Sequence, residues 1–200
     1  MKNFTWSPMR QWATLLVVAG LQSLVLASMV WGRANLLANG REVVLEVVPV
    51  DPRDIFRGEY VILGYKFMQP GDAELPQGTQ TGDKVFVTLT RATTADKDWT
   101  VKSIAPQHPG AAGTEDVVLK ATVSDIYHRA PEDVAAGKPP RGRLRFGIES
   151  YFVPEGQGKV LEEQVREGRI EAVVAVGTDG TAALKALIID GKRVVEEPLI

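Results

Sequence analysis

One uncharged apolar run near the N-terminus constrains this 200-residue chain more than any other feature. Residues 13 to 30 read ATLLVVAGLQSLVLASMV and contain no Asp, Glu, Lys or Arg. A helix over this run would rise about 27 Å, close to the roughly 30 Å hydrocarbon core of a bilayer. Trp12 and Trp31 flank the run, and indole rings favour the headgroup level. The pattern predicts a transmembrane anchor over residues 12–31.

Two other interpretations of the run stay open. A core helix of a soluble protein usually carries a polar stripe, and the run's few polar residues are too weak to form one. A cleaved signal peptide would place small residues before the cleavage site, and Val25 and Ala27 suit those positions. The apolar stretch is longer than the usual signal core and continues to Trp31, which favours the anchor.

The anchor predicts three parts and an orientation. Residues 1–11 form an N-terminal tail, residues 12–31 the anchor, and residues 36–200 a single soluble domain. Lys2 and Arg10 precede the anchor, and Arg33 and Arg41 follow it. These charges nearly balance, with a slight lean towards a cytoplasmic N-terminus and an extracytoplasmic (periplasmic) domain.

The composition excludes several classes of function. Charged residues make up 24% of the chain and the net charge is -2, which argues against a nucleic-acid partner. The chain has no cysteine, so disulfides, thiolate metal sites and cysteine nucleophiles are excluded. His108 and His128 lie near Pro or Gly in apparent loops and are expected to be solvated. We therefore predict no metal site and no cofactor.

The soluble part has the pattern of a mainly β domain. No alternation of strands and helices occurs along the sequence. Asp51 begins an expected turn, and residues 159–166 fit one short amphipathic helix. Residues 171–195 contain Asp179-Gly180 and Asp190-Gly191, and Asp-Gly is typical of hairpin turns, so we expect a three-stranded antiparallel meander there. A β-sandwich or partly open barrel of eight or nine strands follows. The other expected strands are residues 42–50, 60–67, 84–91, 99–104, 117–127 and 143–153.

Residues 49–67, PVDPRDIFRGEYVILGYKF, resemble the signature of the GDYXXLXY family of membrane-anchored proteins. The pattern matches at Gly58, Tyr60, Leu63 and Tyr65, and Glu59 stands where the family has Asp. Residues 147–162 also resemble the family's C-terminal part, and the resemblance spans roughly residues 10–195. It implies a membrane protein, often associated with a multi-spanning membrane protein, and it implies no particular activity.

The motif permits two interpretations. The first is a rigid corner, in which the tyrosines pack with satisfied hydroxyl groups. Strand alternation puts Leu63 and Tyr65 on the same face. The second is a surface that binds a protein partner or an envelope glycan, for which Tyr and Arg are well suited. The candidate binding residues are Asp51, Arg53, Asp54, Arg57, Gly58, Glu59, Tyr60, Leu63, Tyr65 and Glu155.

Catalysis is the alternative to binding. Asp54 or Glu59, paired with Glu149, Glu155 or Glu162, would supply the two carboxylates of a hydrolase that acts on envelope polymers. The sequence contains no nucleophile-elbow serine, phosphate-binding loop or HExxH helix. We therefore favour a non-catalytic protein-binding or scaffolding module of the cell envelope.

Overall fold

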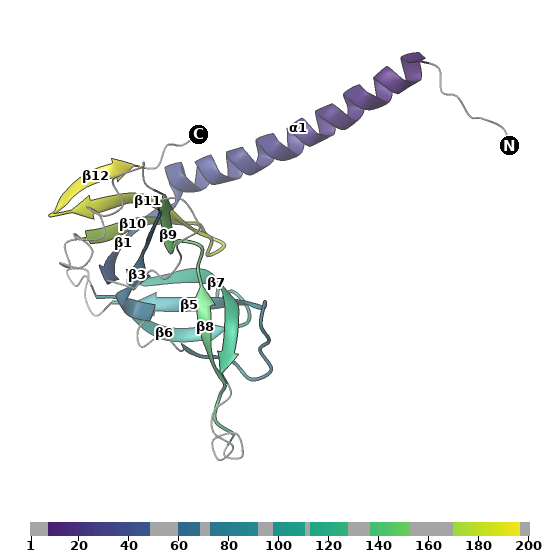
Figure 1. Cartoon of the computed structure of the whole chain (residues 1–200). Coiled ribbons are helices and arrows are strands. Elements are labelled where there is room, and N and C mark those ends of the chain that lie inside the picture. The colour runs from purple at the N-terminus through teal and green to yellow at the C-terminus, as the bar shows by residue number, and fades with distance from the viewer. Residues whose placement is uncertain are drawn as a thin grey trace.

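The computed structural model describes residues 8–48, 60–68, 73–91, 98–110, 113–127, 137–152 and 170–196. Within these ranges a long helix, α1 (Pro8–Asn39), precedes a β domain that also contains the short 3-10 helix η1 (Lys66–Met68) (Figure 1). The strands are β1 (Arg41–Val48), β2 (Tyr60–Ile62), β3 (Gly64–Tyr65), β4 (Ala73–Glu74), β5 (Lys84–Thr90), β6 (Thr100–Ala105), β7 (Asp116–Tyr127), β8 (Arg141–Arg145), β9 (Ser150–Phe152), β10 (Ile170–Val176), β11 (Ala182–Ile189) and β12 (Lys192–Glu196).

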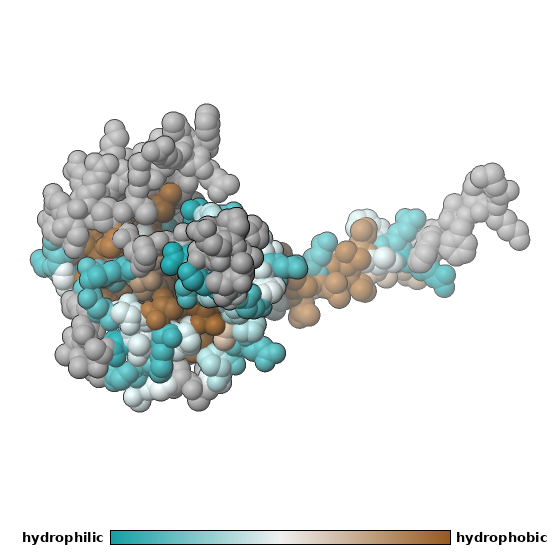
Figure 2. Space-filling view, turned by 90° about the horizontal axis from the view of Figure 1, so that it is seen from below, coloured by the Kyte–Doolittle hydropathy of each residue, from teal (hydrophilic) through white to brown (hydrophobic). Residues whose placement is uncertain are grey.

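The helix α1 is longer than the predicted anchor at both ends and leaves its apolar run uncovered. Trp12 and Trp31 are 68% and 76% exposed, and no residue of its most apolar 18-residue window is buried. Figure 2 shows this apolar surface along the middle of the projecting helix. The core-helix interpretation is therefore wrong. By length and composition, α1 fits a membrane anchor, and it fits a signal sequence as well.

The end of α1 is seated directly on the β domain. Leu37 is buried in a small cluster with Ala175 and Ala183 of β10 and β11. The N–H of Gly40 donates to the Leu36 carbonyl at 2.8 Å, and β1 begins at the next residue. Residues 32–35, which separate the predicted anchor from the predicted domain, are helical. The helix and the sheet are thus joined without a flexible linker among these residues.

Two five-stranded antiparallel sheets enclose one hydrophobic core. The first sheet has the order β12-β11-β10-β1-β3 and the second the order β4-β8-β7-β5-β6. A separate ribbon pairs β2 with β9. Val43 and Leu45 of β1 share a core cluster with Val87 of β5 and Leu119 of β7, so both sheets contribute to it. The prediction of a mainly β fold behind one N-terminal helix is confirmed.

The C-terminal meander is confirmed. β10, β11 and β12 pair in sequence order as antiparallel neighbours. Both Asp-Gly turns use the left-handed backbone region, with φ of +81° at Gly180, +49° at Asp190 and +75° at Gly191. Glycine adopts this region without the steric cost that a side chain imposes, which explains why these positions mark the turns.

Two predicted strands are wrong as continuous elements. The strand expected at 60–67 breaks at Leu63, where the chain leaves its pairing with β9 and joins β1. The strand expected at 143–153 breaks after Arg145 at a turn in which Gly147 has φ of +80°. In both cases one apolar run serves two sheets, and residue type alone does not mark the corner between them.

The number of strands also differs from the prediction. The described residues contain twelve strands, against the eight or nine expected. The three strands beyond nine arise because the strand expected at 60–67 divides into β2 and β3, the strand expected at 143–153 divides into β8 and β9, and β4 was not expected. The strands β2, β3, β4 and β9 are two or three residues long and too short to show a period-two pattern. The expected turn at 51–54 and the expected helix at 159–166 lie outside the described residues.

Candidate functional site

Two residues of the motif, Leu63 and Tyr65, lie inside the domain. Leu63 is 1% exposed and Tyr65 is fully buried, so neither side chain is presented on the surface. The backbone of Tyr60 pairs with Phe152 in the β2–β9 ribbon. The other candidate binding residues lie outside the described ranges: Asp51, Arg53, Asp54, Arg57, Gly58, Glu59 and Glu155.

The Tyr65 side chain spans the corner between the two halves of the domain. Its hydroxyl donates a hydrogen bond of 2.7 Å to the carbonyl of Ile148. Its ring stacks on Phe67 at 5.8 Å, and Phe67 in turn meets Phe146 edge-on at 5.4 Å. Burial raises the pKa of Tyr65, and the negative charge of Glu149 adds to the effect. Tyr65 therefore remains a protonated donor inside the core.

Glu149 holds the turn that Tyr65 contacts. Its carboxylate accepts hydrogen bonds from the N–H of Phe146 and, at 2.8 Å, from the N–H of Gly147. Its carbonyl accepts a 2.7 Å hydrogen bond from the N–H of Leu63. Both ends of the residue are thus used to fix the corner. Glu149 is the only acid proposed for the hydrolase that lies among the described residues, and these bonds give it a structural role.

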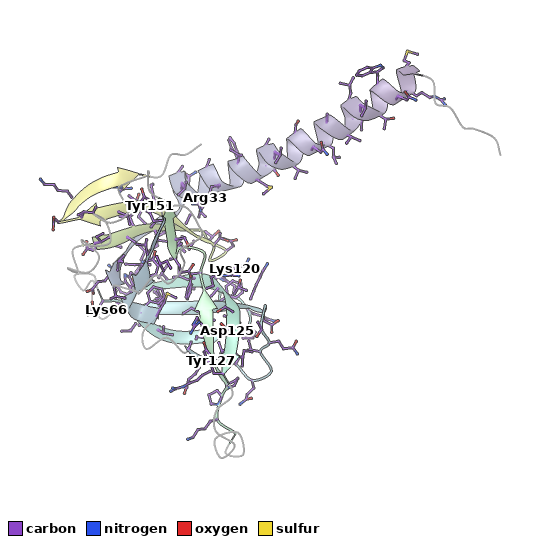
Figure 3. The ribbon with its side chains drawn as sticks, viewed as in Figure 1. Arg33, Lys66, Lys120, Asp125, Tyr127 and Tyr151 are labelled. Atoms are coloured by element: carbon purple, nitrogen blue, oxygen red, sulfur yellow. The ribbon has the colours of Figure 1, made fainter. Side chains whose placement is uncertain are left out.

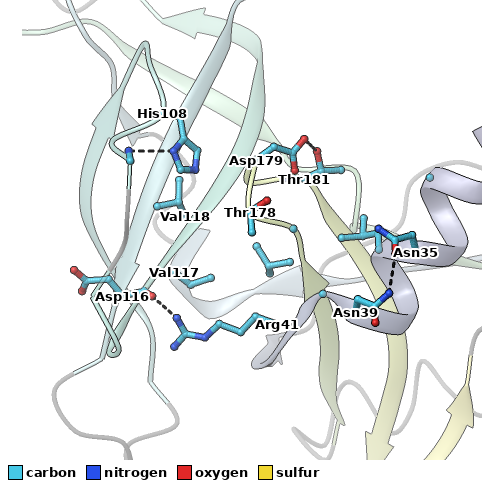
Figure 4. A pocket seen from close by; sticks show the side chains of 16 residues that line it. Asn35, Asn39, Arg41, His108, Asp116, Val117, Val118, Thr178, Asp179 and Thr181 are labelled. Carbon is cyan, nitrogen blue, oxygen red and sulfur yellow. Dashed lines mark hydrogen bonds between the residues drawn. The ribbon is translucent and has the colours of Figure 1, made fainter.

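A groove of about 850 Å³ lies between the end of α1 and the β domain (Figure 4). We refer to it as the helix-end groove. Its walls are the last turns of α1, the start of β1, the start of β7 and the β10–β11 turn. The polar side chains that line it are Asn35, Asn39, Arg41, His108, Asp116, Thr178, Asp179 and Thr181.

Arg41 ties the two sheets together across the groove. Its guanidinium donates to the carbonyls of Thr114 and Asp116, the latter at 2.7 Å. The side chain of Asp116 accepts a separate bond of 2.7 Å from the Lys102 ammonium group. This bond is the main cause that lowers the pKa of Asp116, and a bond with the Thr90 side chain is the second cause. Arg41 belongs to the first sheet and Asp116 to the second, so these bonds fix the separation of the groove walls.

The opposite wall is a turn closed by its own side chains. The Asp179 carboxylate accepts from the backbone N–H of Thr181 at 3.1 Å and from its hydroxyl at 2.6 Å. The Thr181 hydroxyl bond is the main cause that lowers the pKa of Asp179. On the helix side, the Asn39 amide donates to the Asn35 side-chain oxygen at 2.7 Å. The groove therefore offers fixed polar donors and acceptors, which suits recognition of a polar surface.

His108 lies in a loop, as expected, and its side chain is half-buried where it lines the groove, so it is only partly exposed to solvent. Its ring meets Phe86 edge-on at 5.2 Å, and its Nδ1 accepts from the N–H of Gly110 at 3.1 Å. His128 lies outside the described ranges. Among the residues that the structure describes, no three His, Cys, Asp or Glu side chains come together as metal ligands.

Sequence reasoning did not find the helix-end groove. Its lining comes from segments that are far apart in the chain, and only the fold brings them together. One local signal was visible, the Asp179-Gly180 turn. The place of Arg41 near the end of α1 was not visible, because the predicted anchor ended at residue 31 and the helix continues to Asn39.

The family model of the GDYXXLXY protein matches residues 22–187. This range covers well over half of the chain. The chain belongs to the GDYXXLXY family. No curated protein and no solved structure matches the chain.

Both the corner at Tyr65 and the helix-end groove lie within the range that the family model matches. The matched range begins within α1 and ends within β11, so it contains the helix end, the motif and the groove walls. Of the residues in the GDYXXLXY pattern, Leu63 and Tyr65 are core residues here. These two residues of the pattern therefore build a structural corner.

Proposed function

We propose that this GDYXXLXY family member is a single-pass membrane protein whose β domain binds a protein partner in or just above the membrane. The division into a tail (1–11), an anchor (12–31) and a domain (36–200) is part of this proposal. One observation carries it: the helix α1 exposes its apolar middle and buries only its end, where Leu37 is 1% exposed against the sheet.

The rigid junction supports a partner at the membrane surface. From Trp31 to Asn39 the helix rises about 12 Å, so a headgroup-level Trp31 would hold the helix-end groove close to the bilayer. A multi-spanning membrane protein is a partner within reach of such a groove. Gly20 has open space around its Cα and lies near Gln22 on α1, which suits contact with another helix.

The proposed orientation places the N-terminus in the cytoplasm and the domain in the extracytoplasmic space. Lys2, Arg10 and the α-amino group lie before the anchor, and no acid occurs in the first 32 residues. Arg33 and Arg41 on the other side nearly balance them by count, so the lean is slight.

Binding, rather than catalysis, fits the polar groups that the structure describes. Arg41 and Glu149 are bonded to backbone groups, and Asp179 is bonded within its own turn. A surface of pre-arranged polar groups lowers the entropy that a partner loses on binding. The remaining candidates predicted from the motif stay part of the proposed contact surface: Asp51, Arg53, Asp54, Arg57, Gly58, Glu59, Tyr60 and Glu155.

Photocrosslinking in intact membranes tests the proposal. A photoreactive residue at Thr178, which is exposed in the groove, is compared with one at Lys192, which is exposed on β12. We expect a discrete adduct with a membrane protein from position 178 and none from position 192. Equal adducts from both positions, or none from 178, would contradict a partner at the groove.

Protease protection tests the orientation. In sealed vesicles with their cytoplasmic face outward, the extracytoplasmic domain is expected to resist digestion, while an N-terminal tag on residues 1–11 is removed. Digestion of the domain would reverse the proposed topology. Loss of the tag from the mature protein before any protease is added would identify α1 as a cleaved signal peptide.

A further inference from the structure

Three cationic side chains meet at a small cavity where β7 changes its neighbour. β8 pairs with β7 only as far as the Thr122–Arg145 pair. Beyond that point the backbone N–H of Lys120 donates to the Gly180 carbonyl of the β10–β11 turn, at 2.7 Å. A cavity of about 310 Å³ lies between the end of β8 and this turn. We refer to it as the basic pocket.

The strand register brings the cations together. Lys84, Thr122 and Arg145 are cross-strand partners on β5, β7 and β8, in one row across the sheet. Neighbouring strands are about 4.8 Å apart, so the row spans roughly 10 Å. Lys120 is two residues from Thr122 and shares its outward face. These four residues line the pocket together with Phe146, Gly147, Thr181 and Ala182.

The cations of the basic pocket have no ion-pair partner among the described residues. Lys84, Lys120 and Arg145 line the pocket without any acidic side chain. Other cations of the domain have such partners, for example Lys102 with Asp116. Two carboxylates border the pocket, and both are already engaged: Asp179 with the Thr181 hydroxyl, and Glu149 with the N–H groups of Phe146 and Gly147.

Like charges that converge without a counter-ion repel one another, and an anion bound between them removes that repulsion. Ammonium, guanidinium and hydroxyl groups are the donors that phosphate oxygens accept most strongly. The row of cross-strand partners is about 10 Å wide, which is wider than one phosphate group. The row therefore leaves room for the polar groups that are attached to the phosphate of a diester. The chemistry of the pocket is therefore that of a phosphodiester site.

The position of the pocket favours a lipid as the source of the phosphate. Thr181 lines both the basic pocket and the helix-end groove, so the two lie side by side at the end of α1. Figure 3 shows Lys120 nearer to the end of α1 than Asp125 and Tyr127 of the same strand. We propose that the basic pocket binds the phosphate of an anionic phospholipid headgroup. This inference rests on the proposed membrane location of α1 and is independent of the proposed protein partner.

Calorimetric titration of the full chain in detergent micelles tests the site. The probe is the short-chain lipid dihexanoyl phosphatidylglycerol, compared with dihexanoyl phosphatidylcholine and with inorganic phosphate at constant ionic strength. We expect saturable binding of the anionic lipid. The zwitterionic lipid carries the same phosphodiester, but the cations of the pocket repel its choline ammonium, so its binding is expected to be at least about tenfold weaker. Free phosphate lacks the groups attached to the diester that would fill the rest of the cationic row, and its binding is also expected to be at least about tenfold weaker.

Paired variants separate a site from general charge. The test variant carries Lys120→Gln and Arg145→Gln, and its affinity for the anionic lipid is expected to fall at least about tenfold. The control carries Arg141→Gln and Arg143→Gln, which removes the same charge from β8 outside the pocket, and its affinity is expected to change less than about twofold. Circular dichroism of both variants checks that the β domain is folded.

Three results would overturn the inference. Equal affinity for the two lipids would show that the site does not select an anionic headgroup. An equal loss of affinity for the anionic lipid in the two variants would show that the pocket is not the binding site. Binding of inorganic phosphate as tight as that of the anionic lipid would assign the site to a free anion. Flotation of the full chain with phosphatidylcholine vesicles tests α1 separately, because insertion of α1 requires no anionic lipid. If the chain does not float with these vesicles but still binds the anionic lipid in solution, the proposed membrane anchor is contradicted and the lipid-binding pocket is not.

Discussion

The Tyr65 hydroxyl donates a 2.7 Å hydrogen bond to the Ile148 carbonyl in the core of the domain. The two residues are 83 positions apart, and each lies at a point where the chain passes from one sheet to another. The neighbouring Leu63 N–H bonds to the carbonyl of Glu149 in the same way. The motif and the 146–149 turn therefore form one unit, which joins the β2–β9 ribbon to both five-stranded sheets.

Replacing Tyr65 with Phe is expected to destabilise the domain by about 1–3 kcal/mol. The ring remains and leaves no cavity, but the Ile148 carbonyl loses its hydroxyl donor inside the core. Urea unfolding of the full chain in detergent measures the loss, with Tyr127→Phe as the matched control. The Tyr127 ring is 36% exposed beside Arg143, so its variant should lie within about 0.5 kcal/mol of the parent. If both variants lose the same free energy of unfolding, the hydrogen bond of Tyr65 does not stabilise the core.

The same substitution is expected to have a pH signature. Burial raises the pKa of Tyr65 in the folded state above its ordinary value near 10. The folded state then holds the proton more tightly than the unfolded state, so the parent loses stability as the pH rises above about 10. The Phe variant lacks this titration. The difference in free energy of unfolding between parent and variant should therefore narrow from pH 9 to pH 11, and a constant difference would contradict the buried hydroxyl.

The sequence predicted the elements whose pattern is local. The uncharged run, the alternating strands and the two Asp-Gly turns each carry their signal within a few residues. The strands β5 and β7 and the C-terminal meander follow the prediction closely, and α1 contains the predicted run but extends beyond it at both ends. Alternation also placed Leu63 and Tyr65 on one face, and both are buried. What the alternation did not reveal is that this face is the core and not a contact surface.

The corners and the cavities required the fold. The breaks at Leu63 and after Arg145 arise because one apolar run serves two sheets, and both halves of such a run look like strand. The helix-end groove and the basic pocket depend on register: Lys84, Thr122 and Arg145 are neighbours only because β5, β7 and β8 align them. No spacing in the sequence encodes that row.

Truncation of Leu37 is expected to loosen the junction between α1 and the sheet. Leu37 packs on Ala175 and Ala183, and a buried Leu→Ala change costs at least about 2 kcal/mol. The Gly40 amide, which bonds to the Leu36 carbonyl, reports on this docking through hydrogen exchange. In the Leu37→Ala variant its protection should fall about 30-fold, which corresponds to that free energy.

The control for the junction lies on the same helix. Leu24 is 70% exposed, so Leu24→Ala removes an equal volume without touching the sheet. Its effect on exchange at Gly40 is expected to be less than about twofold. If both variants exchange at the parent rate, the docking of α1 is not what fixes the groove, and the rigid junction fails as the support for a partner at the membrane.

Two turn glycines offer a test of how the β10–β11 turn is held against β7. Gly180 and Gly191 have nearly the same φ, +81° and +75°, so alanine meets similar backbone strain at both, about 1–2 kcal/mol. A Cβ at Gly191 meets open space, whereas one at Gly180 would lie 3.2 Å from the Lys120 nitrogen and 3.4 Å from the Phe86 ring. Urea unfolding should therefore show Gly180→Ala as more destabilising than Gly191→Ala, by about 1 kcal/mol or more.

Because the backbone bond from Lys120 to Gly180 also borders the basic pocket, only the Gly180 variant should disturb lipid binding there. Equal destabilisation by the two alanines would mean that the turn is not packed against β7, and the wall shared by the groove and the pocket would lose its support.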